Sequence, residues 1–290
     1  TLASNNSNNG LIAIEGYVQT NGGVGRGGTI IIQSSSDIQI NSAILQAIGQ
    51  TNGGFISIVS TTGNSIIQSS LVQTNGSSGR GGSISISAAN QTLIFNSVIE
   101  ANGLIQGGTI LIGNDAQNGT LPFSLYTSID LNSSVSALGL NSNLNNGGYI
   151  ETSGHTLNLL GSINAGRGGM WLIDPSDLTI TQMFANLLST NIATSNITIN
   201  VTPSSCATTY GDCGSATGTG SIYIDTQATI NKASGSATTL TFNAFGSIYD
   251  YGTITSAAGS PLSLVFNAGV NNPVKQSVVF SGTGTVTTNG

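Results

Sequence analysis

Charge is the first thing that this sequence has little of. Only 6% of its 290 residues are Asp, Glu, Lys or Arg, with 5 basic residues against 11 acidic ones and a formal net charge of −6. Nucleic-acid binding depends on clustered Lys and Arg side chains that neutralise phosphates. Five dispersed basic residues supply no such cluster. The sequence therefore predicts no nucleic-acid partner.

Long apolar runs are also missing. None approaches the roughly 18–20 residues that a membrane-spanning helix needs, so no membrane insertion is predicted. Helix-favouring Glu, Lys, Arg and Met are scarce, whereas Ile, Val, Thr, Asn and 40 Gly favour strands and turns. A hydrophobic content of 38% is enough for a core. The composition predicts an almost entirely β fold.

Cysteine is rare. Cys206 and Cys213 are the only two, and six residues separate them. A pair this close, without a further Cys or His beside it, makes a poor zinc site. We expect a disulfide that closes a small loop, as in proteins of oxidising compartments. Two reduced thiols that happen to be neighbours are the alternative.

Groups that carry catalysis are few. His155 is the only histidine, and the acidic residues mostly stand alone. The one close acidic pair, Asp174 and Asp177, lies in LIDPSDL, where Asp is typical of turns. The sequence predicts no enzymatic activity, no cofactor and no metal site. An enzyme acting on polysaccharides, which needs clustered carboxylates, remains a remote alternative.

What the sequence does contain is a repeat. Residues 19–32 read QTNGGVGRGGTIII and residues 73–86 read QTNGSSGRGGSISI, and weaker copies begin with later Gly pairs. Alignment on the Gly pairs produces one column of large apolar residues: Ile30, Ile56, Ile84, Ile110, Ile150 and Trp171. Alternate residues of a strand share a face, so this column is predicted to be buried.

The repeat length indicates a stack of coils. The first four copies are spaced by 26 or 28 residues, and each holds about three short strands. Self-similarity of this kind predicts a parallel β-helix, a solenoid of about ten or eleven coils. The corners are predicted at three GRGG segments: Arg26, Gly27, Gly28, Arg80, Gly81, Gly82, Arg167, Gly168 and Gly169. We expect the arginines to bond carbonyls or a carboxylate such as Asp37 or Glu100; a receptor-binding stripe of arginines is the alternative.

The pattern divides the chain into three segments. Residues 1–174 carry the double-Gly repeats, interrupted by a projecting loop at about 113–128. Residues 175–220 are predicted to be an irregular transition that holds the disulfide loop and a short lateral helix near 182–189. Residues 221–290 resume the β-helix with coils of about 24–26 residues.

Residues 147–180, GGYIETSGHTLNLLGSINAGRGGMWLIDPSDLTI, carry a resemblance to a known family. They resemble the large exoproteins of bacterial two-partner secretion, of the filamentous-haemagglutinin and high-molecular-weight adhesin type. This resemblance implies a right-handed parallel β-helix, export through an outer-membrane partner barrel, and a secreted or cell-surface location. Some members are glycosylated at Asn-x-Ser/Thr sites, and Asn118 in the predicted loop is the candidate here.

The function expected from these features is structural and adhesive. The chain is predicted to form the rigid stalk of a secreted bacterial adhesin, whose host or cell-surface receptor the sequence does not identify. The alternative is a subunit of an extracellular filament that self-associates end to end. A carbohydrate-binding face ranks last, because the six candidate tyrosines, including Tyr223 and Tyr249, are not expected to share a column.

Overall fold

The computed structural model describes residues 1–4, 10–116, 119–141, 144–203, 219–282 and 284–288. It is mostly β, with parallel sheets and a single helix among these residues. The chain forms two compact units, Thr1–Met170 and Trp171–Gly290, called unit 1 and unit 2 below. The predicted all-β parallel fold is confirmed at this level.

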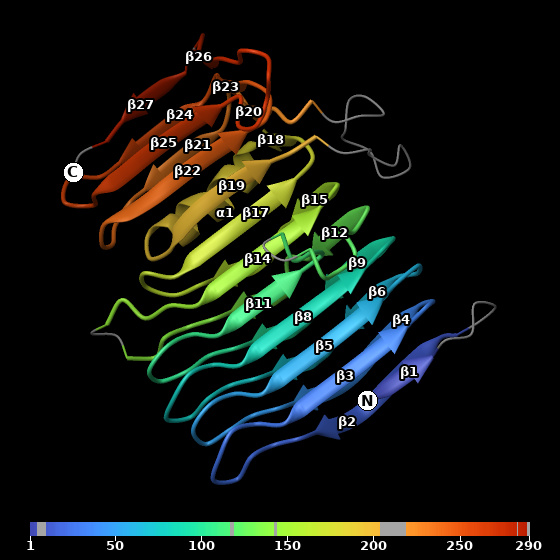
Figure 1. The fold of residues 1–290 in the computed structure, drawn as a ribbon. Helices are drawn as coiled ribbons and strands as arrows, with labels where there is room; N and C mark the ends of the chain where they lie inside the picture. The colour runs from blue at the N-terminus through green and yellow to red at the C-terminus, as the bar shows by residue number, and fades with distance from the viewer. Residues whose placement is uncertain (5–9, 117–118, 142–143, 204–218, 283, 289–290) are drawn as a thin grey trace. The chain divides into compact units, whose positions relative to one another are not determined.

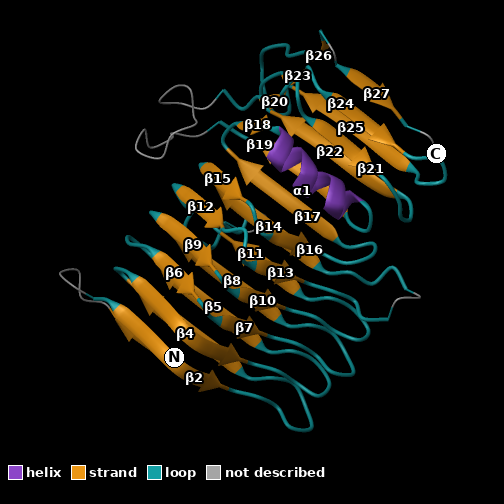
Figure 2. Ribbon diagram, turned by 180° about the vertical axis from the view of Figure 1, so that it is seen from behind, coloured by secondary structure: helices purple, strands orange, loops and turns teal. Residues whose placement is uncertain are grey.

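Unit 1 consists of three columns of parallel strands, each column receiving one strand from every repeat (Figures 1 and 2). The first contains β1 (Leu2–Ser4), β3 (Thr29–Ser34), β5 (Phe55–Ser60), β8 (Ser83–Ala88), β11 (Thr109–Ile112) and β14 (Tyr149–Gly154). The second contains the first halves of β2 (Ile12–Gln19) and β4 (Ile38–Gln46), then β6 (Ser65–Gln68), β9 (Gln91–Phe95), β12 (Tyr126–Ile129) and β15 (Thr156–Leu159). The third contains the second halves of β2 and β4, then β7 (Leu71–Gln73), β10 (Val98–Glu100), β13 (Ser134–Ser136) and β16 (Ser162–Asn164).

The first column brings equivalent apolar residues into register. Ile30 pairs with Ile56, Ile56 with Ile84, Ile84 with Ile110, and Ile110 with Ile150. All five are at most 4% exposed. Each such side chain contributes about 1.5–3 kcal/mol by leaving water. The core of unit 1 is therefore built by like side chains packed on like.

A bend joins the second and third columns. Residues at the bend adopt the left-handed conformation, with φ of 49°, 48° and 45° at Ser42, Ser69 and Asn96. The amide after each bend bonds a serine of the next repeat, as Ala43 N donates to Ser70 Oγ at 3.0 Å and Ser70 N to Ser97 Oγ at 3.1 Å. Buried serines thus accept from amides that the bend removes from regular strand pairing.

Unit 2 also has three columns. The first contains β17 (Met170–Pro175), β19 (Asn196–Val201), β22 (Thr238–Ala244) and β25 (Leu262–Ala268). The second contains β18 (Leu178–Ile180), β20 (Ile222–Ile224), β23 (Ile248–Asp250) and β26 (Val278–Phe280). The third contains β21 (Thr229–Lys232), β24 (Thr253–Ser256) and β27 (Thr285–Thr287). The third column has one strand fewer, because the repeat that begins with β17 and β18 continues into a helix.

That helix, α1 (Gln182–Ile192), confirms the helix predicted near 182–189. Thr181 caps it, since Thr181 Oγ1 accepts from Phe184 N at 3.4 Å, and Phe184 and Leu188 lie on its buried face. Figure 2 shows α1 beside β21, in the position of a strand. Trp171, the last member of the predicted core column, is fully buried in unit 2.

The three segments predicted from the sequence can be compared with the elements found in each. Within the described part of 175–220, the region predicted to be irregular, lie β18, α1 and β19. In the region predicted to resume the repeat, Phe242 pairs with Phe266, and their rings stack at 5.0 Å. The loop predicted at about 113–128 ends where β12 begins at Tyr126.

Candidate functional site

The predicted corners form a column of backbone hydrogen bonds in unit 1. The amide of Gly27 donates to Asn52 O at 2.9 Å, and in the next repeat Gly53 N donates to Arg80 O at 2.9 Å. The series continues from Gly81 to Gln106, from Gly107 to Asn146 and from Gly147 to Arg167, with distances of 2.8–2.9 Å. The position before the Gly pair is thus occupied in turn by Arg26, Asn52, Arg80, Gln106, Asn146 and Arg167.

Glycine is required at this corner because neighbouring repeats approach closely. A Cβ on Gly27 would lie 2.0 Å from Ala47 O, and one on Gly81 would lie 2.0 Å from Ala101 O. The second glycine of each pair is similarly crowded, since a Cβ on Gly82 would lie 2.1 Å from Gly54 O and one on Gly28 2.8 Å from the Thr20 side chain. Backbone approach therefore selects these residues.

The third corner, in GRGG at 166–169, is made differently. Gly168 has a φ of +71°, a conformation that residues with a Cβ rarely adopt. A Cβ on Gly169 would lie 2.1 Å from Ala165 O. The three GRGG segments therefore use glycine for two reasons, close approach at all three and left-handed geometry at the last.

The three corner arginines are exposed. Arg26 Nε donates to Gly53 O at 3.3 Å, which is the carbonyl bond predicted for a structural role. Glu100, a suggested carboxylate partner, accepts from Gln73 and Asn75 instead, at 2.7 and 3.0 Å. Receptor binding by the arginines stays a prediction.

Gln73 and Glu100 belong to a ladder of side chains that the sequence analysis missed. Gln19 donates to Gln46, Gln46 to Gln73, and Gln73 to the carboxylate of Glu100, at 2.8, 2.7 and 2.7 Å. The three glutamine amides donate in the same direction, and the ladder ends at the Glu100 carboxylate, which can only accept. The signal was present in the sequence as glutamines 27 residues apart.

The loop between β11 and β12 is held by a buried carboxylate. Glu151 is 0% exposed, and its oxygens accept from Ala116 N at 2.8 Å, Ser153 Oγ at 2.9 Å and Tyr149 Oη at 3.2 Å. Burial raises the pKa of Glu151, and the nearby Asp115 carboxylate raises the pKa further, whereas the three hydrogen bonds oppose the shift. These donors enclose the carboxylate, so it anchors the loop.

His155, the only histidine, lies near the same loop. Its ring packs on Phe123 with centroids 4.5 Å apart, and burial lowers the pKa of His155. This contact favours a packing role for the ring. Asn118, the glycosylation candidate in this loop, lies outside the described residues, as do Cys206 and Cys213.

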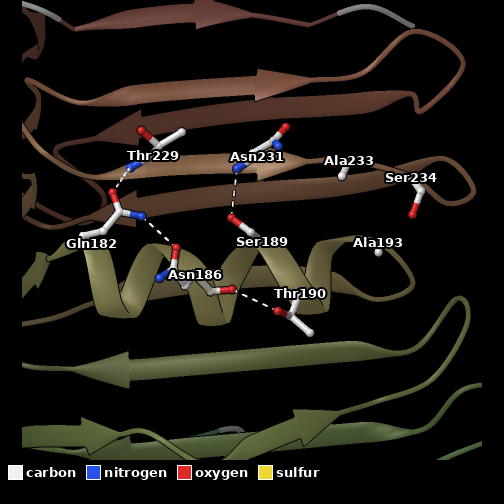
Figure 3. Close-up of a pocket in the computed structure, with 9 residues that line it drawn as sticks. All are labelled: Gln182, Asn186, Ser189, Thr190, Ala193, Thr229, Asn231, Ala233 and Ser234. Atoms are coloured by element: carbon white, nitrogen blue, oxygen red, sulfur yellow. Dashed lines mark hydrogen bonds between the residues drawn. The ribbon is translucent and has the colours of Figure 1, made fainter.

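A groove of unit 2 lies between α1 and β21 (Figure 3). It has a volume of about 570 Å³ and is lined only by uncharged residues. Gln182 Oε1 accepts from Thr229 N at 3.1 Å and Ser189 Oγ from Asn231 N at 2.9 Å, so helix side chains take the place of a neighbouring strand. Part of the polar lining is therefore already used to satisfy the edge of β21.

A buried lysine joins the end of α1 to the sheet. Lys232 is 0% exposed, and its Nζ donates to Ile192 O, Ser236 O and Thr238 Oγ1, each at 2.8 Å. Ile192 is the last residue of α1, where the helix dipole favours a cation. Burial nevertheless lowers the pKa of Lys232. Nothing in the sequence around Lys232 marked it as buried.

Two of the six candidate tyrosines share a column that the sequence analysis did not identify. Tyr223 and Tyr249 are register partners in β20 and β23, and their rings stack at 4.9 Å. Tyr251 lies beside Tyr249, with ring centroids 6.2 Å apart. The sequence alignment missed this column because β20 and β23 carry no Gly pair to align on.

No group of three or more His, Cys, Asp or Glu side chains in the described part of the chain could hold a metal ion. None of its helices has the length and apolar character needed to span a membrane. Comparison with protein-family models, with curated proteins and with solved structures found no match.

Proposed function

We propose that the chain is part of a single right-handed parallel β-helix that forms the stalk of a secreted bacterial surface adhesin. The observation that carries this proposal is the register of equivalent residues. In unit 1 one column pairs five isoleucines in succession, from Ile30 to Ile150. In unit 2 Tyr223 stacks on Tyr249 and Phe242 on Phe266. Such pairing joins each repeat only to its neighbours, which suits a protein that spans distance.

Bonds between repeats support a rigid stalk. The Gln19–Glu100 ladder and the corner amides connect successive repeats outside the core. Aligned hydrogen bonds of this kind reinforce one another. A stack joined by core, ladder and corner resists bending more than a stack joined by its core alone.

The location and the secretion partner rest on the resemblance of residues 147–180 to two-partner-secretion exoproteins. The proposal therefore includes export through an outer-membrane partner barrel and display at the cell surface. The loop that Glu151 anchors and the groove beside α1 are the two surfaces on which we place adhesive contact, because loops and grooves carry function on repeat scaffolds.

Electron microscopy of the material isolated from its native source tests the proposal. Thin single rods, with a parent chain much longer than 290 residues by mass spectrometry, are the expected result. Long uniform filaments in which this chain is the repeating subunit would overturn the stalk and favour self-association. Globular particles would overturn both.

A further inference from the structure

Four Asn-Gly pairs at the corners of unit 1 share one pattern of contacts. Each pair contacts the backbone of one residue in the next repeat. The contacts are Asn21-Gly22 to Ile48, Asn52-Gly53 to Arg80, Asn75-Gly76 to Asn102, and Asn102-Gly103 to Leu138. Asn is among the thermally labile residues of proteins. A following glycine increases the lability, because no side chain hinders attack by its nitrogen on the Asn side chain.

Each pair forms hydrogen bonds with both the backbone N–H and the backbone C=O of one residue in the next repeat. Asn75 Oδ1 accepts from Asn102 N at 2.8 Å, while Gly76 N donates to Asn102 O at 2.8 Å. The other three pairs do the same, with Oδ1 distances of 2.9, 2.9 and 2.7 Å and glycine N distances of 2.8, 2.9 and 2.9 Å for Asn21, Asn52 and Asn102. We call this pair of bonds the inter-repeat clamp.

The clamp engages both groups that deamidation uses. In that reaction the glycine nitrogen attacks the Asn Cγ, a Gly N–Cγ bond forms, the Cγ–Nδ2 bond breaks, and ammonia leaves with the amide proton. Water then opens the cyclic imide at either carbonyl and leaves Asp or isoaspartate. In the folded chain the glycine N–H is donated to the next repeat, and the side-chain amide is fixed by its own bond.

We propose that these four asparagines are deamidation sites that the inter-repeat clamp keeps closed, so that modification reports the opening of a repeat. Loss of contact between two repeats frees the glycine nitrogen and the side-chain amide together. The covalent change then remains after the repeats close again. This inference stands on unit 1 alone and does not depend on the proposed function.

The consequence of modification differs between sites. Asn75 Nδ2 donates to Glu100 Oε2 at 3.0 Å, so an acid in place of this amide would set a second carboxylate against Glu100. Asn21 Nδ2 donates weakly, at 3.4 Å, to the amide oxygen of Gln46. The Gln46 amide is neutral, so an acid in place of Asn21 would lose this weak bond without setting two carboxylates against each other. Modification at Asn75 is therefore expected to prevent the repeats from closing properly, whereas modification at Asn21 is tolerated.

The test uses a matched control on the same turn. Val24 is 88% exposed and precedes Gly25, whose position leaves nothing within 4 Å of an added Cβ. Val24→Asn therefore creates a further Asn-Gly pair close to Asn21, without a clamp. The intact variant is incubated at mildly alkaline pH, folded or in guanidinium chloride, and each pair is followed by peptide mass spectrometry.

We expect the four clamped pairs to deamidate at least about tenfold more slowly in the folded protein than in denaturant, because reaction must await opening of the repeat. The pair created by Val24→Asn should react at nearly the same rate in both conditions. Equal rates for clamped and unclamped pairs in the folded protein would overturn the proposal. Slow reaction of the new pair would also overturn it, since protection would then not come from the clamp.

A second pair of variants tests the consequence. Asn75→Asp should unfold at lower denaturant concentration than Asn21→Asp, because only the carboxylate at position 75 would face Glu100. Equal midpoints at neutral pH would refute the assignment of Asn75 as the damaging site.

Discussion

Units 1 and 2 build the same three-column arrangement with different chemistry. Unit 1 has corners with Gly-Gly pairs at which the backbones of neighbouring repeats approach closely, and a Cβ on Gly81 would lie 2.0 Å from Ala101 O. Unit 2 has no Gly-Gly pair in its sequence; it stacks Phe242 on Phe266 and buries Lys232 at the end of α1. Register between repeats can therefore be fixed by close approach of the backbone at a Gly-Gly pair, which leaves no room for a Cβ, or by large side chains that fill the contact.

The two solutions differ in what they leave visible in a sequence. A glycine corner recurs as GRGG or GG and can be aligned by eye. A buried lysine or a stacked tyrosine pair leaves no such mark. We therefore expect the two units to respond differently to substitutions, and four variants test this in order of decreasing effect.

Ile84→Asp attacks the core of unit 1 and should have the largest effect. Ile84 is 0% exposed and pairs with Ile56 and Ile110. A charge there has no partner and no water, so we expect a loss of more than about 4 kcal/mol, enough to unfold the neighbouring repeats. Chemical denaturation followed by circular dichroism measures it.

Ile84→Val is the control, with an expected loss of about 0.5–1.5 kcal/mol. An unchanged melting curve for Ile84→Asp would mean that this column does not face inward. Hydrogen exchange should place the damage in unit 1.

Gly81→Ala tests the glycine corner. Its Cβ would meet Ala101 O at 2.0 Å and Gly108 N at 2.6 Å, both backbone atoms that cannot rotate away. Overpacking of this kind should cost about 1–3 kcal/mol or more. Gly25→Ala, where a Cβ meets nothing within 4 Å, should change the unfolding free energy by less than about 1 kcal/mol. Equal losses for the two variants would show that close approach of the backbone does not select glycine at position 81.

Lys232→Met tests the side-chain solution in unit 2. The variant keeps the stem but loses three hydrogen bonds, so we expect a loss of about 1–3 kcal/mol at neutral pH. The pKa of Lys232 is lowered by burial, so the unfolded chain binds the proton more readily. Wild-type stability should therefore rise relative to the variant as pH increases from the lowered pKa toward 10.5, the ordinary value. Urea titrations at several pH values measure the difference; a difference that shrinks as pH rises would contradict this account.

Glu151→Gln should have the smallest effect at neutral pH, within about 1 kcal/mol, because the amide oxygen can still accept from Ala116 N. The larger difference between Glu151→Gln and the wild type is expected in how the free energy of unfolding depends on pH. The pKa of Glu151 is raised above 4.5 in the folded chain, so the wild type should lose stability relative to the variant as pH rises through that window. A pH-independent difference between the two melting curves would show that this carboxylate is not strained by burial.

The sequence predicted the parallel β fold and its core because two signals coincided, a Gly pair and an alternation of Ile after it. Ile56 and Ile84 align on their Gly pairs alone. The inter-repeat clamp could not be predicted in this way. Asn75 accepts from the backbone N–H of a residue 27 positions later, and a backbone group leaves no pattern of residue types in the sequence. Lys232 was also missed, because its neighbours come from α1 and β22. The alternation of apolar residues predicts which face of each strand is buried. Contacts between repeats also depend on the backbone conformation at each corner, which the alternation does not specify.

Hydrogen exchange at a second column of glycines, Gly22, Gly49, Gly76 and Gly103, measures the register of unit 1 most directly. The amides of Gly22, Gly49, Gly76 and Gly103 donate to carbonyls of the next repeat at 2.8–3.0 Å. We expect them to exchange as slowly as amides of the core strands, since they open only when repeats separate. Exchange at the rate of freely exposed amides would contradict a stack whose repeats are joined through their corners.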